Sequence, residues 1–362
     1  MVSTVPEALG PAENSSQDSA RERFLQCART GFFRHAVSDA LGGAGDSFSD
    51  LAQAHDALGL ATQDPGLLLA INAHLWGAVF VIQRFGDRSQ KQAWIPALLE
   101  GSVIAGHAIT EPQAGSDIYA MEMDYQASGE GYILNGRKRF VTNTPIANMM
   151  VVYAKLSGTE KISAFMIRAE DAGADFLDSP TVKGCATATM GDIVLTDCVI
   201  PGSRQLGKTG AGGTMIQLAL ELERAFIFSG IAGVMQWQLQ QVIRYARSRK
   251  SGEGTLAQHQ AIAHKIAEMK LRLDTTRLWI QHCAHLLDTG KRITVPSAET
   301  KLYASEAFLQ SSLDAVHIFG ASGLTGPLLT LVNDAMAGRL MSGSSEIQKN
   351  IIAAMSGVAG RP

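Results

Sequence analysis

The chain has 362 residues, of which 46% are hydrophobic and 18% are charged, and its formal net charge is -3. This composition is typical of a globular protein with roughly two or three packed cores, and it excludes a strongly basic nucleic-acid-binding surface. The longest apolar stretch, residues 67–82, is interrupted by Asn72 and His74 and is too short for a comfortable membrane span.

The cysteines and the first residues give no sign of a metal site or a secretion signal. Cys27, Cys185, Cys198 and Cys283 lack CxxC spacing, which argues against a zinc site or a disulfide framework. They are expected to be buried as small hydrophobic side chains. Residues 1–20 have no basic start and no apolar core, which predicts a flexible leader rather than a signal peptide, and a cytoplasmic protein.

The first block after the leader, residues 21–104, has the spacing of helices. Apolar residues recur every three or four positions in LAQAHDALGLA, and a second helix is predicted over 67–85, ending at Gly86. We therefore expect an N-terminal helical domain.

The pattern then changes twice. Residues 105–205 contain short runs rich in β-branched and aromatic residues between turn residues, which predicts a central β-barrel domain. The predicted strands are 131–134, 139–142, 149–153, 162–167 and 193–195. In residues 206–362 long helical segments return, which predicts a C-terminal four-helix bundle. The predicted helices are 215–249, 256–288, 297–318 and a last helix near 327–339. The fold class is thus predicted to be α+β.

The segment AITEPQAGSD, residues 108–117, has the features of a turn that holds a ligand. Pro112 fixes its own φ and biases Glu111 away from the helical region, so the chain turns directly after an apolar, strand-like run. Gly115 and its small neighbours leave room for a flat ring or a phosphate against the main chain. The alternative is an ordinary capped turn in which Asp117 binds local backbone amides.

Six segments in order give the chain a resemblance to the acyl-CoA dehydrogenase family over about residues 30–357. They are FGDRSQKQAWIPALLEG (85–101), AITEPQAGSD (108–117), NGRKRFVTN (135–143), LERAFIFSGIAG (222–233), YARSRK with LAQHQ (245–260) and RLMSGSSEIQKNII (339–352). The resemblance implies removal of two hydrogens from the α and β carbons of an acyl thioester on CoA or a carrier protein, with FAD as hydride acceptor. Such a reaction needs a carboxylate at the α carbon and donors on the thioester oxygen.

The resemblance also implies which residues bind the cofactor. Ile109 and Thr110 resemble positions that contact the flavin ring, and Gly115 and Ser116 resemble positions beside the flavin phosphate and the thioester. Phe140 and Thr142 match positions at the ring edge. The other implied cofactor residues are Arg249, Ser251, His317, Gly320, Ser344 and Glu346. Arg249 and Ser251 match positions that touch the FAD of a neighbouring subunit, which implies a homodimer or homotetramer.

The position of the catalytic base departs from the commonest family pattern. Most members carry a Glu where this chain has Ser342, and a serine hydroxyl without a base cannot remove the α-proton. A minority, resembling isovaleryl-CoA dehydrogenase, supply the base from the first bundle helix, where the matching residue here is Glu223. We therefore expect Glu223 to be the base, Ser342 to contribute its backbone N–H, and Ser116, Arg224 and Met341 to contact substrate.

Other functions are compatible with the same sequence. Glu223 is alternatively an ion-pair partner on a solvated helix face. A chain without a working base is alternatively a flavin-dependent monooxygenase or oxidase, and a chain that fails to bind flavin is a non-catalytic assembly partner. Electrons are expected to pass to an acceptor protein or to oxygen, and the irregular motifs favour a specialised biosynthetic role.

Overall fold

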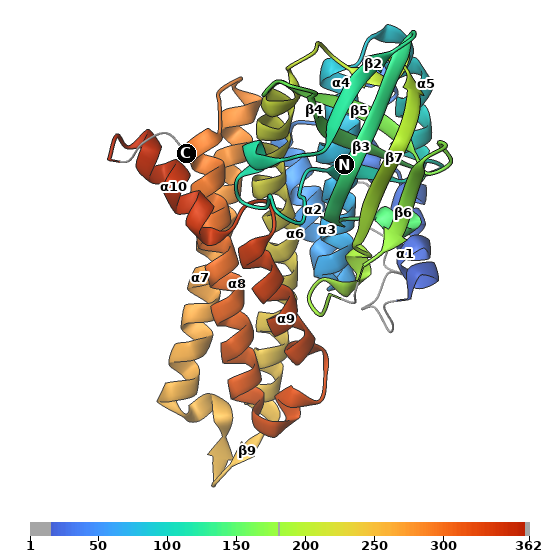
Figure 1. Cartoon of the computed structure of the whole chain (residues 1–362). Coiled ribbons are helices and arrows are strands. Elements are labelled where there is room, and N and C mark those ends of the chain that lie inside the picture. The colour runs from blue at the N-terminus through green and yellow to red at the C-terminus, as the bar shows by residue number, and fades with distance from the viewer. Residues whose placement is uncertain (1–15, 180–181, 359–362) are drawn as a thin grey trace.

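A helical domain, a β domain and a helical bundle follow one another along the chain, as predicted (Figure 1). The computed structural model describes residues 16–179 and 182–358. Most of the predicted leader lies outside the described residues. Its last part is wrong as a flexible segment, because helix α1 (Gln17–Arg29) begins inside it, with Ser16 as N-cap and Ala20 buried. The four cysteines are free and buried, as predicted.

The N-terminal domain is built from helices that bury one long apolar helix. Its helices are α1, α2 (Phe48–Thr62), α3 (Pro65–His74), α4 (Phe80–Phe85) and α5 (Arg88–Glu100). Helices α3 and α4 join through a π-helical turn, Leu75–Val79, so that residues 65–85 run as one element. By length and apolarity this element could cross a membrane, but 94% of its most apolar window is buried inside the fold. It is a core helix here.

The β domain is one mixed sheet of eight strands. They are β1 (Ala105–Ala108), β2 (Asp124–Ser128), β3 (Gly131–Val141), β4 (Met149–Leu156), β5 (Ile162–Arg168), β6 (Ala174–Asp178), β7 (Gly191–Pro201) and β8 (Gln205–Leu206). The order is β6-β7-β3-β2-β4-β5-β8, with β1 parallel to β4. The two strands predicted at 131–134 and 139–142 are a single strand, β3. Register shifts against β7 interrupt its alternation, which is why the sequence pattern divided it in two.

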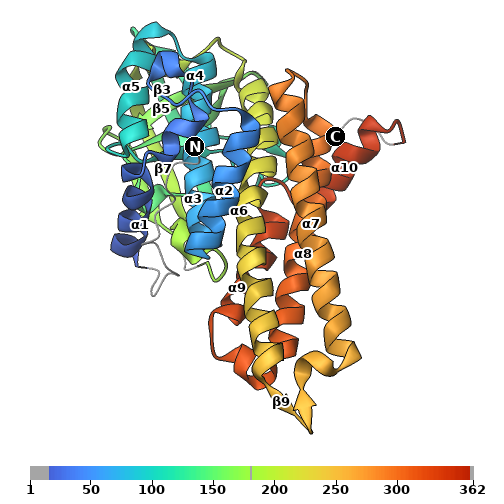
Figure 2. The same ribbon diagram turned by 180° about the vertical axis from the view of Figure 1, so that it is seen from behind.

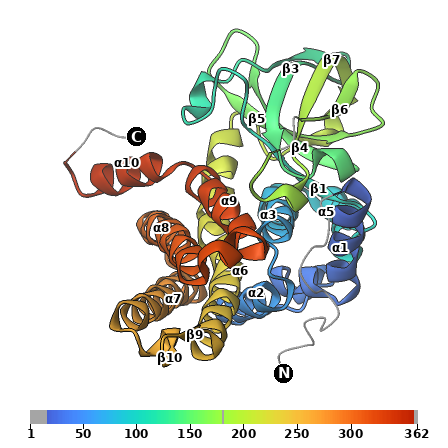
Figure 3. The same ribbon diagram turned by 90° about the horizontal axis from the view of Figure 1, so that it is seen from below.

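The C-terminal bundle consists of four long helices, as predicted. They are α6 (Gly212–Ser248), α7 (Gln260–Asp288), α8 (Thr294–Phe319) and α9 (Pro327–Leu340), and Figure 3 shows them side by side. A short hairpin, β9 (Lys250–Ser251) with β10 (Gly254–Thr255), joins α6 to α7. A further helix, α10 (Ser345–Met355), packs on α8 and projects away from the bundle; the sequence did not predict it as a helix.

Helix α6 is central because it contacts both helical domains (Figure 2). It crosses α2 at very short range, since a Cβ on Gly59 would lie 1.8 Å from the carbonyl oxygen of Gly230, and one on Gly233 would lie 2.0 Å from that of Asp56. Only glycine permits so close an approach. Every residue from 221 to 235 of α6 is buried, and Glu223 lies in this segment.

Candidate active site

A buried ion pair between Glu111 and Lys138 stabilises the AITEPQAGSD turn. After β1, the chain turns through reciprocal backbone hydrogen bonds between Glu111 and Ala114. The Glu111 carboxylate accepts the N–H groups of Glu122 and Met123 at 2.6 and 3.1 Å. It also accepts Lys138 Nζ at 2.7 Å, and the same ammonium donates to the Ile109 carbonyl oxygen at 3.0 Å.

Lys138 is completely buried in this position. Burial lowers the pKa of Lys138 to about 8, against the opposing effect of the Glu111 carboxylate. The pair fixes the backbone of Ile109 and the fold of the turn, since a buried charge without its partner is strongly unfavourable. Lys138 lies in the segment NGRKRFVTN, and no role for it was predicted from the sequence.

The open face of the turn lies beside the end of β3. The N–H of Arg139 donates to the carbonyl oxygen of Thr110 at 2.8 Å, which brings Phe140 and Thr142 next to the predicted flavin-binding turn. Phe140 has a φ of 54° and is 50% exposed, although it is a large apolar side chain. Gly115 and Ser116 are also exposed. The Arg139 guanidinium lies over the Phe140 ring at 4.9 Å from its centroid, and a half-exposed aromatic ring beside small residues fits a planar ring such as that of FAD.

Glu223 lies buried close to strand β1. Its side chain is 6% exposed, and its Oε2 lies 3.5 Å from Nε2 of His107 in β1. Within the described residues, this oxygen accepts no hydrogen bond. The alternative of a solvated ion pair on a helix face is therefore wrong, because the Glu223 side chain is buried inside the protein beside β1.

The neighbouring Arg224 connects α6 to the segment with the missing carboxylate. Arg224 is buried, and its Nε donates to the carbonyl oxygen of Ser342 at 3.0 Å. Burial lowers the pKa of the Arg224 guanidinium, against the effects of Glu221 and Glu223. Ser342 has a φ of 53°, and in the described part of the chain its Oγ is buried without a partner. Met341, just before it, is half-buried at the end of α9.

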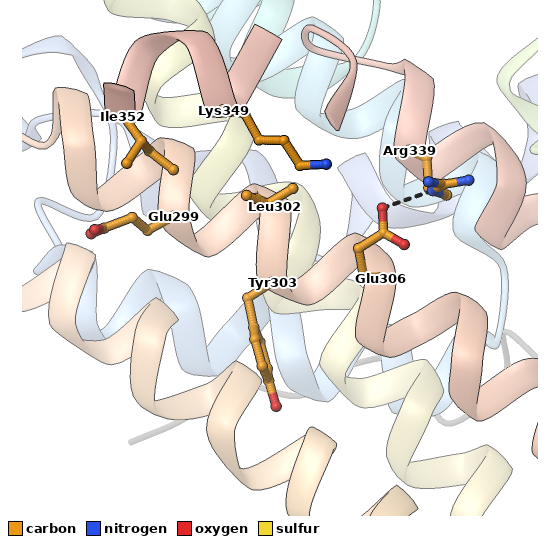
Figure 4. Close-up of a pocket in the computed structure, with 7 residues that line it drawn as sticks. All are labelled: Glu299, Leu302, Tyr303, Glu306, Arg339, Lys349 and Ile352. Atoms are coloured by element: carbon orange, nitrogen blue, oxygen red, sulfur yellow. Dashed lines mark hydrogen bonds and ion pairs between the residues drawn. The ribbon is translucent and has the colours of Figure 1, made fainter. Parts of the chain in front are cut away.

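Ser344 and Glu346 begin α10 beside this segment. The Ser344 hydroxyl accepts the N–H of Ile347 at 3.4 Å as the N-cap. Glu346 is exposed in the first turn, where its own backbone N–H and the Ser344 hydroxyl hold its pKa below the usual value. A pocket of about 480 Å³ lies between α8, the end of α9 and α10 (Figure 4). Arg339 and Glu306 form an ion pair of 2.8 Å in its wall, and none of the predicted site residues lines it.

Four of the predicted cofactor residues lie at the opposite end of the bundle. Arg249 and Ser251 follow the last turn of α6. In that turn the Tyr245 ring stacks on the Phe319 ring, with the ring centroids 4.0 Å apart. This contact places His317 and Gly320, which flank Phe319 in the chain, at the same end of the bundle. The helical rise between residues 223 and 249 is about 39 Å. Figure 1 shows the β9 hairpin far from the β domain. Within one subunit these four residues are thus separated from Thr110, Phe140 and Glu223.

Comparison with known proteins identifies the family to which the chain belongs. Models of the N-terminal, middle and C-terminal domains of acyl-CoA dehydrogenases match residues 5–102, 106–198 and 210–356. The chain belongs to the acyl-CoA dehydrogenase family, and the predicted resemblance is confirmed. It is an FAD-dependent oxidoreductase that dehydrogenates acyl thioesters.

The similar proteins include enzymes of carrier-protein chemistry. An L-prolyl-[peptidyl-carrier protein] dehydrogenase of Serratia sp. is 34% identical over 94% of this chain and 89% of its own length. An isovaleryl-CoA dehydrogenase of Arabidopsis thaliana is 32% identical over 78% of this chain and 71% of its own. The structure of the prolyl acyl carrier protein oxidase AnaB has a TM-score of 0.90 and 34% identity, covering 93% of this chain and 90% of that one. The FAD complex of PigA has a TM-score of 0.89 and 33% identity, covering 94% and 90%.

Proposed function

We propose that Glu223 is the base that removes the α-proton of the thioester. The observation that carries the proposal is a buried carboxylate with one oxygen free of hydrogen bonds, next to the strand that leads into the flavin-binding turn. A carboxylate that has no donor on one oxygen is available to accept a proton. The matching family position, Ser342, offers only an unpartnered hydroxyl.

FAD, when bound, accepts the hydride that leaves the β carbon. The chain's own residues orient the reaction. Ile109, Thr110, Phe140 and Thr142 line one surface for the flavin ring, and Gly115 and Ser116 leave the main chain open beside it. The backbone N–H of Ser342 donates to no group among the described residues. Its being unpaired supports a role for this N–H as a donor to the thioester oxygen. Arg224 holds the carbonyl of the same residue in place.

We further propose that the acyl group is carried by a carrier protein and is a small amino-acyl group such as L-prolyl. Support comes from the two prolyl-carrier-protein dehydrogenases, which are 34% and 33% identical over 94% of this chain. We also propose that the enzyme works in the cytoplasm, in a specialised biosynthetic pathway. In this proposal it is a homodimer or homotetramer, and an acceptor protein or oxygen takes the electrons from the flavin.

Anaerobic bleaching of the flavin tests both parts. The L-prolyl thioester of a holo-peptidyl carrier protein is mixed with the purified flavoprotein, with butyryl-CoA and isovaleryl-CoA as comparison substrates. We expect bleaching with the prolyl thioester, its loss in Glu223→Ala and its retention in Ser342→Ala. If the CoA esters bleach the flavin and the prolyl thioester does not, the proposed carrier is contradicted. If Glu223→Ala bleaches as fast as the wild type, the proposed base is contradicted.

A further inference from the structure

His107 faces the carboxylate of Glu223 across the boundary between two domains. His107 belongs to β1 and Glu223 to α6, and the side chains are 9% and 6% exposed. The distance from Nε2 to Oε2 is 3.5 Å, which is within ion-pair range but longer than a good hydrogen bond. In the sequence, His107 directly precedes the AITEPQAGSD segment.

The backbone gives His107 a single direction. Its neighbours in β1, Gly106 and Ala108, lie on the opposite face of the strand, where Ala108 joins the core of the β domain. Ala105 and Ile109 share the face of His107 and pack against the helical core. His107 thus points from the sheet toward the helices, two residues before the start of the predicted flavin contacts.

The π-helical turn makes room for the imidazole. A Cβ on Gly77 would lie 2.6 Å from Cγ of His107, closer than real Cβ atoms approach other carbons. Gly77 is the middle residue of the turn Leu75–Val79, and π-helical turns occur frequently at functional sites. The ring therefore lies in a slot formed by an irregular turn and a glycine, with Glu223 at its Nε2 end.

The surroundings of the two ring nitrogens of His107 favour one tautomer. Within the described residues Nδ1 is buried and has no partner. An imidazolium would leave a buried Nδ1–H without an acceptor, whereas the neutral ring with its proton on Nε2 leaves only a lone pair there. That tautomer directs its N–H at Glu223. A donor facing the carboxylate favours the ionised form, which is the form that can accept a proton.

We propose that His107 is a positioning residue for Glu223, whose Nε2–H orients the carboxylate and keeps it ionised for proton removal. This proposal rests on Glu223 being the base. In the described part of the chain, the titratable groups next to Glu223 include the imidazole of His107 from β1 and the guanidinium of Arg224 from α6 itself, whose Nε donates to the Ser342 carbonyl oxygen. Nε2 of His107 lies 3.5 Å from the free carboxylate oxygen without forming a hydrogen bond to it, so the ring is placed to orient this oxygen while leaving it able to accept a proton.

The test measures the titration of the Glu223 carboxyl directly. Infrared difference spectra of the flavoprotein without substrate are recorded against pH, and the carboxyl band that is absent in Glu223→Gln identifies Glu223. The variants are His107→Gln, His107→Asn and His107→Leu. Gln places its amide nitrogen near the position of Nε2, whereas Asn places it near Nδ1, so the pair differs in the position of the donor and little else.

We expect the midpoint of this band to rise by about one pH unit in His107→Leu and His107→Asn, and to stay near the wild-type value in His107→Gln. Gly77→Ala displaces the His107 ring, so it should raise the midpoint of the Glu223 titration when His107 is present. In the His107→Leu background it should cause no further rise of this midpoint. The acid limb of the pH profile for flavin bleaching should move in parallel.

Two results overturn the proposal: an unchanged midpoint in His107→Leu, or equal behaviour of the Gln and Asn variants. Failure of the proposed base is a separate result. If Glu223→Gln still bleaches at the wild-type rate, Glu223 is not the base, whatever the infrared midpoints show about its pairing with His107.

Discussion

Arg224 and Ser342 are joined by a hydrogen bond of 3.0 Å from a buried guanidinium to a backbone carbonyl. This bond ties the helix that carries Glu223 to the segment where most family members carry their base. Ser342 has a φ of 53°, a conformation that is uncommon for a residue with a side chain. The two possible base positions of the family are thus part of one connected site.

Arg224→Gln should destabilise the fold by about 1.5–3 kcal/mol, because a buried bond from a charged donor is lost. Ser342→Ala is the matched control. It keeps the carbonyl and removes only a hydroxyl that has no partner in the described part of the chain, so its effect should be below about 1 kcal/mol. Urea unfolding monitored by circular dichroism measures both. Equal destabilisation by the two variants would show that the bond contributes little.

Lys138→Met should destabilise the fold by about 3–5 kcal/mol, since it leaves the Glu111 carboxylate buried without its cation. It should also lower the FAD content, because Ile109 loses the donor on its carbonyl. The double variant Lys138→Met with Glu111→Gln removes both charges and should recover part of the stability. Flavin-to-protein ratio and unfolding free energy are the measurements, and a double variant less stable than Lys138→Met would contradict the pairing.

Lys301 should make stability depend on pH. It is buried, and burial together with the nearby Arg224 lowers its pKa from 10.5 to about 7. The folded chain therefore releases this proton first, and above pH 7 the unfolded chain binds more protons. The free energy of unfolding from this group rises with pH between about 7 and 10.5. Between pH 7 and 9 the wild type should gain about 2–3 kcal/mol relative to Lys301→Met. A constant difference across this range would contradict the low pKa.

Arg249 should act on the flavin of another subunit, because about 39 Å of helix separates it from Glu223 in its own. Mixed oligomers of Arg249→Ala and Glu223→Gln test this by complementation. A subunit with intact Glu223 receives an intact Arg249 from its partner, so co-expressed variants should regain activity that neither has alone. Absence of recovery in verified hetero-oligomers would mean that Arg249 serves its own subunit or none.

Local sequence patterns predicted most of the fold. Helical periodicity located α6, α7, α8 and α9 to within a few residues, and the change to β-branched runs located the β domain. Helix α10 was missed because its segment, SEIQKNII, was interpreted as a motif rather than as a helix. Strand β3 was divided in two, since shifts of register hide the alternation on which strand prediction depends.

The arrangement of the site depended on contacts that no local pattern contains. The burial of Glu223 follows from the packing of α6 against other elements, including His107 of β1 beside its carboxylate. The pairing of His107 with Glu223 depends on a π-helical turn around Gly77, which sequence periodicity does not distinguish from an ordinary helix. The role of Lys138 depends on Glu111 in a turn far from it in the chain.

The most direct test of Glu223 as the base is exchange of the substrate α-proton in D₂O. With the flavin already reduced, hydride transfer is blocked, and deuterium uptake at the α carbon of the L-prolyl thioester reports proton removal alone. Mass spectrometry should show rapid uptake with the wild type and Ser342→Ala, and uptake slowed by about 10³-fold with Glu223→Gln. Uptake by Glu223→Gln within about tenfold of the wild-type rate would contradict the assignment.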